Sequence, residues 1–369
     1  MIASSISSKE PPQAKDAASI YKAILKTQWL EEKKELGMEL GRLGSQSEPF
    51  LLKLYEAESY WDRIAAISAS TKYFSAAVNS RLVKSYLEDH MVETESESAI
   101  QSNLEKYIEQ IRQNWDSDVK IESRKKMIKL LALSNDSQAI EFSKREIEDR
   151  GSKYRSIAFQ TLCSKKEKKD DVYIRSKLAE KDIRQYALKY ILETGQPSDK
   201  KIMLDVLSEI QIQNADFTFA LGGIKKWGSF QEQEIEYTKA LQNEKYDDSL
   251  KLYSIVLFRE FRSEPIRVSL CEISKYARDQ SARVTASEAL VPFQNIKNIE
   301  CLKRIVNEDF QSSNQGFGFG DAVAMFATLG ISNVLRGIQE NRSRASFLGR
   351  QNELKKHIQF LELKAKENN

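Results

Sequence analysis

The stretch DIRQYALKYILETG, residues 182–195, places Arg184, Ala187 and Ile191 at offsets of zero, three and seven. Because an α-helix completes a turn in about 3.6 residues, these three side chains fall on one helix face. Asp182 stands just ahead of that face, where its side-chain oxygen can accept the unpaired N–H groups of a first turn. The stretch therefore predicts a capped amphipathic helix with a small residue within its buried face.

The same frame recurs along the chain at intervals of 29 to 33 residues. Its other occurrences are Arg124, Met127, Leu131; Arg155, Ala158, Leu162; Phe217, Ala220, Ile224; Leu250, Tyr253, Leu257; and Arg283, Ala286, Leu290. Another amphipathic segment, such as QAIEFSKREIED at 138–149, lies between successive frames. The interval holds two helices of about a dozen residues and two short turns, which predicts a helical hairpin repeated in series.

The residues at offsets zero and three both have structural explanations. An alanine such as Ala187 lets two helix backbones approach more closely than leucine would. The stem of Arg184 can pack on the neighbouring helix pair while its head bonds to carbonyls or to the acid of the next repeat. A ligand-binding role for these arginines is the alternative.

Residues 182–195 match the D-x-R-x-x-A-x-x-x-L-x-x-x-G frame of the HEAT-like repeats, also called PBS-lyase-type HEAT repeats. The chain resembles this family from about residue 15 to 333, although Phe217 and Leu250 replace the arginine. The resemblance implies an all-α fold, a right-handed α-solenoid of stacked antiparallel helix pairs with the second helices on the concave face. We expect a disordered lead-in at 1–14, the solenoid at 15–333 and basic capping helices at 334–369.

Composition and charge narrow the classes of partner. Six prolines and 14 glycines among 369 residues are few for a fold of many short strands. Lys and Arg outnumber Asp and Glu by 57 to 54, so no strong overall field attracts nucleic acid or an anionic membrane. No apolar run is long enough to span a bilayer. We expect a monomer without a membrane span, and the compartment stays open.

Cysteines and histidines give little support for catalysis. Cys163, Cys271 and Cys301 are far apart and lie in apolar helical patterns, so we expect small core residues and no disulfide or metal site. His90 and His357 are too few for a HEAT-repeat di-iron enzyme, and we expect both at the surface. The sequence therefore predicts no catalytic residues, no cofactor and no metal.

The segment NQGFGFGDAVAMFATLG, residues 314–330, carries three glycines at alternate positions. A dinucleotide-binding loop needs G-x-G-x-x-G after a strand, and a Walker loop needs a lysine; this segment has neither. We expect an extended turn between helices, with Phe317 and Phe319 as exposed contacts.

The resemblance indicates a non-catalytic protein–protein interaction scaffold that binds another protein along its second helices. Offsets one and five face away from the buried stripe, and a merely solvated groove is the alternative interpretation. The expected partner-binding row is Lys125, Lys129, Gln160, Gln185, Lys189, Lys251 and Glu288.

A second relative with HEAT-like repeats is the alkylpurine DNA glycosylase type, which holds DNA with Trp, Asp and Arg. The segments WDR at 61–63 and NWDSD at 114–118 carry those residue types. Arg63, however, occupies the structural arginine position of the repeat, and the nearly neutral body offers few charges to replace the counterions of DNA. Nucleic acid is therefore the less favoured partner.

Overall fold

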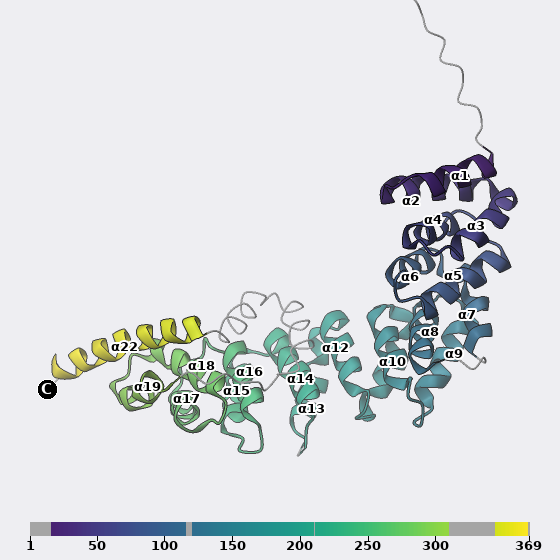
Figure 1. The fold of residues 1–369 in the computed structure, drawn as a ribbon. Coiled ribbons are helices and arrows are strands. Elements are labelled where there is room, and N and C mark those ends of the chain that lie inside the picture. Colours follow the sequence, from purple (N-terminus) through teal and green to yellow (C-terminus); the bar gives the residue numbers. More distant parts are fainter. Residues whose placement is uncertain (1–15, 116–119, 210, 310–343, 368–369) are drawn as a thin grey trace, which may run out of the picture. The chain divides into compact units, whose positions relative to one another are not determined.

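The computed structural model describes residues 16–115, 120–209, 211–309 and 344–367, and all regular structure within them is helical (Figure 1). The expected all-α class is confirmed. None of the described helices combines the length and the apolar character needed to cross a membrane. The chain divides into two compact units, residues 1–165 (unit 1) and 166–369 (unit 2).

Unit 1 arranges its helices in two layers. Its helices are α1 (Ala17–Lys26), α2 (Leu30–Arg42), α3 (Glu48–Tyr55), α4 (Tyr60–Ser70), α5 (Ala76–Glu88), α6 (Glu93–Gln101), α7 (Ile108–Trp115), α8 (Ile121–Leu133), α9 (Ser137–Glu148) and α10 (Arg155–Ser164). Figure 1 shows α2, α4 and α6 in one layer and α3, α5 and α7 in the other. Each even-numbered helix also packs against the helix before it, which makes a series of helical hairpins.

Two glycines bring α2 and α4 into close contact. A Cβ added at Gly37 would lie 3.0 Å from the carbonyl carbon of Ala65, and one at Gly41 would lie 3.0 Å from that of Ala69. The four-residue step is the same on both helices, so α2 and α4 run parallel with their N-terminal ends together. All four residues are buried, which shows small residues setting the helix spacing in this layer.

Unit 2 continues the pattern of paired helices. Its helices are α11 (Asp171–Ser176), α12 (Arg184–Thr194), α13 (Lys200–Leu207), α14 (Asn214–Trp227), α15 (Phe230–Gln242), α16 (Asp248–Leu257), α17 (Glu264–Tyr276), α18 (Gln280–Leu290), α19 (Ile299–Val306) and α22 (Arg344–Glu367). Helices α12, α14, α16 and α18 contact one another in order, and α13, α15 and α17 each pack against the helix that follows. The terminal helix α22 packs on α18 and α19 and buries Leu354, Ile358 and Leu361.

The repeated arginine connects one helix pair to the next. Arg184, at the start of α12, is 3 % exposed and donates to Asp216 of α14 at 2.7 Å and to Glu209 at 3.1 Å. Arg283, at the same position of α18, donates to the carbonyls of Ala277 and Arg278 at 2.6 and 2.8 Å. In both cases the guanidinium donates to oxygen atoms of the chain itself, a carboxylate for Arg184 and backbone carbonyls for Arg283. This is the structural role that the sequence predicts for the repeated arginine.

Helix starts agree with the sequence in part. Asp247 and Asp279 accept backbone N–H groups of the first turns of α16 and α18, each at 2.9 Å, as expected of capping residues. Asp182 is not the N-cap of α12. The N-cap residue is Ile183, and no side chain makes a capping hydrogen bond at the start of this helix. Asp216 lies in the first turn of α14, where its carboxylate accepts from Arg184.

The cysteine prediction is wrong for two of the three residues. Cys271 of α17 and Cys301 of α19 form a disulfide with 5.3 Å between their Cα atoms. They are 30 residues apart, about one repeat, so they occupy corresponding places on adjacent first helices. Cys163 is a buried core residue, as expected.

Candidate functional site

Four large apolar side chains are exposed at the N-terminal ends of successive helices in unit 1. Trp29 directly precedes α2 and is 75 % exposed, and Trp61 lies in the first turn of α4 at 40 %. Met91 stands two residues before α6 at 65 %, and Ile121 begins α8 at 51 %. We call these four residues the apolar row. With Leu25, they are the exposed large hydrophobic side chains among the described residues of unit 1.

Ion pairs hold the N-terminal ends of these helices side by side. The pairs are Lys33 with Asp62 between α2 and α4, Arg63 with Asp89 at 2.9 Å between α4 and the residues before α6, and Lys126 with Glu93 at 2.7 Å between α8 and α6. The first pair is buried, so removing either partner would leave a buried charge. These ion pairs therefore connect the four helix starts that carry the apolar row.

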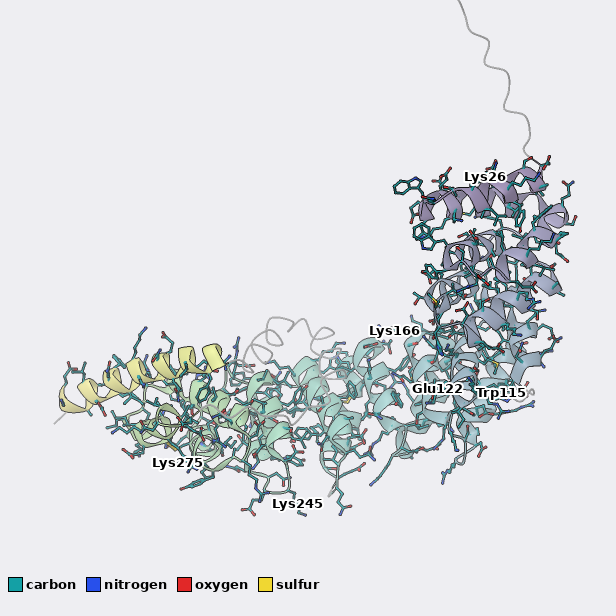
Figure 2. The ribbon with its side chains drawn as sticks, in the orientation of Figure 1. Lys26, Trp115, Glu122, Lys166, Lys245 and Lys275 are labelled. Carbon is teal, nitrogen blue, oxygen red and sulfur yellow. A yellow bond between two sulfur atoms is a disulfide. The ribbon has the colours of Figure 1, made fainter. Side chains whose placement is uncertain are left out.

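Carboxylates stand in the first turns of the helices that carry the apolar row, and lysines pair with four of them. The first turns carry Glu31 and Glu32 in α2, Asp62 in α4, Glu93 and Glu95 in α6, and Glu122 in α8, which Figure 2 labels one residue after Ile121. Carboxylates at these places are favoured by the positive ends of the helix dipoles. The Lys126 ammonium, by its hydrogen bond, holds the pKa of Glu93 below its usual value.

Two of these carboxylates have neutral hydrogen-bond donors. Glu32 accepts from the Thr27 hydroxyl, and Glu95 accepts from the Tyr60 hydroxyl at 3.1 Å. Partial burial and the bond to Glu95 raise the pKa of Tyr60, which keeps that hydroxyl a donor at neutral pH. Neither donor carries a charge, so these two hydrogen bonds do not neutralise the carboxylates.

The expected partner-binding row falls on the same helix layer in unit 1. Lys125 and Lys129 lie one turn apart on α8, and Gln160 is exposed on α10. Lys125 pairs with Glu122 at 2.8 Å and Lys129 with Glu97 at 2.7 Å. These ion pairs neutralise both ammonium groups, so the lysines give this face less positive charge than the sequence implies.

The remaining expected residues lie in unit 2 or outside the described residues. Gln185 and Lys189 are half-buried on α12, and Lys251 is half-buried on α16. Helix α14 lies between α12 and α16 and carries none of the expected residues. Phe317 and Phe319, together with the whole glycine segment at 314–330, lie outside the described residues.

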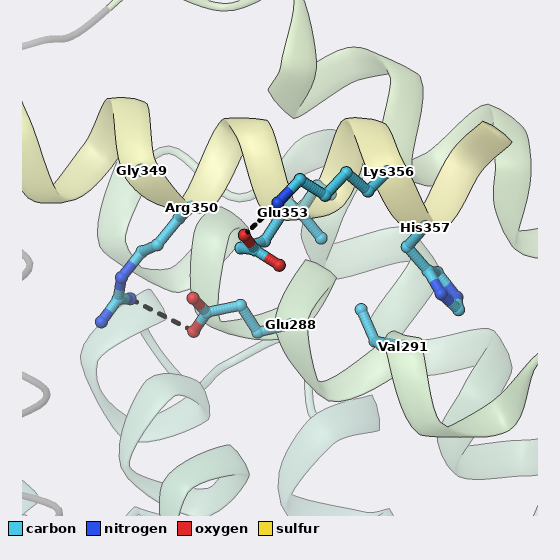
Figure 3. A pocket seen from close by; sticks show the side chains of 8 residues that line it. Glu288, Val291, Gly349, Arg350, Glu353, Lys356 and His357 are labelled. Carbon is cyan, nitrogen blue, oxygen red and sulfur yellow. Dashed lines mark hydrogen bonds and ion pairs between the residues drawn. The ribbon is translucent and has the colours of Figure 1, made fainter. Parts of the chain in front are cut away.

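Glu288 lies in a pocket of about 780 Å³ between α18 and α22. Figure 3 shows Arg350 of α22 reaching its carboxylate, at 3.1 Å, while His357 lies on the far side of Val291. Burial raises the pKa of Glu288 and lowers the pKa of His357. We expected His357 at the surface, but its side chain is half-buried. The Arg350 contact holds α22 against α18, so Glu288 has a structural partner within the chain.

The glycosylase-like segments are engaged in packing. Asp62 is bound by Lys33, and Arg63 donates to the carbonyls of Ala57 and Glu58 at 2.8 and 2.9 Å. The Trp115 ring, labelled in Figure 2, packs edge-on against Phe142 and Tyr154, with centroids 5.0 and 5.4 Å away. In the described part of these two segments, Trp61 is the exposed large side chain, at 40 %.

Sequence reasoning missed the apolar row, although a signal for it exists. Trp29, Trp61, Met91 and Ile121 follow one another at 32, 30 and 30 residues, which is about one repeat. In the structure, each of these large apolar residues lies at or just before the start of a helix. The interval could therefore have identified a surface feature common to successive repeats.

Comparison with known proteins adds little. No family model matches the chain, and no curated protein matches it. A solved structure described as an engineered protein of the Northeast Structural Genomics Consortium is similar over 94% of this chain and 99% of that chain, with 13% identity and a TM-score of 0.38.

Proposed function

We propose that the chain is a non-catalytic interaction scaffold built from HEAT-like repeats, and that unit 1 binds a partner protein along the apolar row. The observation that carries this proposal is the exposure of Trp29, Trp61, Met91 and Ile121 at the N-terminal ends of α2, α4, α6 and α8, which ion pairs connect. Water contact with such side chains is unfavourable, and a partner that covers them gains free energy from their burial. Tryptophan is also among the residues that contribute most to protein interfaces.

The surrounding groups support a specific interface. The Glu32 and Glu95 carboxylates in the first turns of α2 and α6 can select a partner of complementary charge, and the ion pairs between helices fix the positions of the anchors. Little ordering is then needed in the scaffold when a partner binds, which favours affinity.

Selection from a phage-displayed peptide library on the full chain tests this function. Binding of the enriched peptides is then measured for Trp29→Ala and Trp61→Ala, with Tyr276→Ala as the control, because Tyr276 is an aromatic residue 72 % exposed in unit 2. Loss of an interface tryptophan costs about 2 kcal/mol or more, so we expect binding roughly 30-fold weaker in the row variants. Peptides that bind wild-type and row variants equally would contradict the proposal.

A further inference from the structure

The pocket between α18 and α22 has the size and the wall of a small-molecule site. Its volume of about 780 Å³ falls in the range of about 300–1,000 Å³ that is usual for such sites. Val291 and Leu354 give it apolar surface (Figure 3). Gly349 also lines it, and a Cβ built on this glycine would meet no heavy atom within 4 Å. The pocket therefore offers open space next to an apolar wall.

Four charged side chains of the described chain line the same pocket as two ion pairs. Glu288 Oε2 accepts from Arg350 Nη1 at 3.1 Å, and Glu353 Oε1 accepts from Lys356 Nζ at 3.0 Å. Burial lowers the pKa of His357, so the imidazole of this fifth polar group is neutral at pH 7. The four charges cancel, and a ligand that itself carries one charge of each sign preserves that balance.

Both ion pairs keep unused hydrogen-bonding capacity. Within the described chain the hydrogen bond of Glu288 is made through Oε2, so Oε1 can accept from a ligand. Burial raises the pKa of Glu288 even with Arg350 beside it, so a further positive charge would stabilise this carboxylate. The Lys356 ammonium has three N–H donors and gives one of them to Glu353. It can therefore donate to a ligand carboxylate as well.

We propose that this pocket binds a zwitterionic α-amino acid with an apolar side chain. The ammonium group of the ligand donates to Glu288 Oε1, its carboxylate accepts from Lys356, and its side chain lies on Val291 and Leu354. An amine without a carboxylate would bring uncompensated positive charge beside Arg350. A carboxylate without an ammonium group would leave the burial of Glu288 uncompensated. This site lies in unit 2 and is independent of the apolar row of unit 1.

Isothermal titration calorimetry of the full chain with matched small molecules tests the inference. The probes are L-phenylalanine, phenethylamine, which lacks the carboxylate, 3-phenylpropionate, which lacks the ammonium group, and glycine, which lacks the apolar body. Each of the last three loses one of the contacts named above. We therefore expect L-phenylalanine to bind at least tenfold more tightly than any of them.

The variant Gly349→Leu separates ligand binding from folding. Its side chain enters the open space at the pocket wall, and leucine is favoured over glycine within a helix, so the thermal midpoint should not fall. Binding of L-phenylalanine should nevertheless weaken at least tenfold. Glu288→Gln should also weaken it at least tenfold, whereas Glu300→Gln, which changes an exposed carboxylate on α19, is the matched control and should not.

Several results would overturn the inference. Equal affinity for phenethylamine or 3-phenylpropionate would show that the pocket does not recognise both charges, and equal affinity for glycine would remove the apolar contact. Unchanged binding in Gly349→Leu would place the ligand outside this pocket, and this result counts even if Glu288→Gln fails to fold without the Arg350 ion pair. No heat of binding from L-phenylalanine up to its solubility limit would exclude this ligand class.

Discussion

Replacing Arg184 by methionine tests whether the repeated arginine is a structural link. Arg184 and Asp216 have side chains 4% and 0% exposed, and Nη2 of the arginine lies 2.7 Å from the carboxylate. Removing one partner of a buried pair leaves the other charge without compensation and costs about 3–5 kcal/mol. The Glu209 carboxylate is 29% exposed and can be solvated by water. Losing its contact with Arg184 therefore adds little to the loss of stability.

The assay is urea unfolding in a Trp29→Phe/Trp61→Phe/Trp115→Phe background, so that the fluorescence of Trp227 reports on unit 2 alone. Arg184→Met should lower the unfolding free energy of unit 2 by about 3–5 kcal/mol. The double variant Arg184→Met/Asp216→Leu is the control, because replacing both partners with apolar groups removes the uncompensated charge, and it should recover most of the loss. A cost below about 1 kcal/mol for Arg184→Met, the range of exposed ion pairs, would refute the reasoning.

The stability of Arg184→Met should also depend on pH. Burial raises the pKa of Asp216 above its ordinary 3.8 even beside Arg184, and removing the guanidinium raises it further. The folded variant then binds a proton more readily than the unfolded chain, so its stability falls as the pH rises above 3.8. The cost of Arg184→Met should therefore be smaller at pH 4 than at pH 7.

Three further predictions concern packing, the disulfide and one carboxylate. Gly37→Ala should lower stability by about 1–3 kcal/mol in thermal unfolding, because its Cβ would collide with α4; an unchanged midpoint would contradict the close approach. Cys271→Ser/Cys301→Ser should cost about 3–4 kcal/mol from the entropy of the 30-residue separation, and reducing agent should shift only the wild-type protein; equal unfolding of both proteins without reductant would contradict the crosslink. Glu232 should titrate at about 2 in NMR, because it accepts from Lys200 at 2.8 Å, so its contribution to stability is present above pH 4.5 and lost as the pH falls toward 2; titration near 4.5 would contradict the bond.

Helical periodicity explains why much of the fold follows from the sequence. The positions of Arg184, Ala187 and Ile191 on one face depend only on local helix geometry, and all three are buried. The contact of Arg184 with Asp216 is also predictable, since an acid about one repeat ahead returns to the neighbouring helix.

Contacts that depend on how helices dock were not predictable in the same way. Glu288 has the sequence spacing of a surface residue, and its side chain stays 38% exposed, but α22 packs beside it and supplies Arg350. The disulfide was missed because 30 residues looks distant along the chain, whereas one repeat brings Cys271 and Cys301 to adjacent helices. The apolar row likewise does not follow from offsets within one helix, because its residues recur at intervals of about one repeat.

Fluorine NMR of protein labelled with 5-fluorotryptophan tests the central claim most directly. The chain has four tryptophans, Trp29, Trp61, Trp115 and Trp227, and single Trp→Phe variants assign their resonances. On saturation with the tightest peptide from the phage selection, the resonances of Trp29 and Trp61 should move while those of Trp115 and Trp227 stay in place. Movement confined to Trp115 or Trp227, or no movement at saturation, would contradict binding along the apolar row.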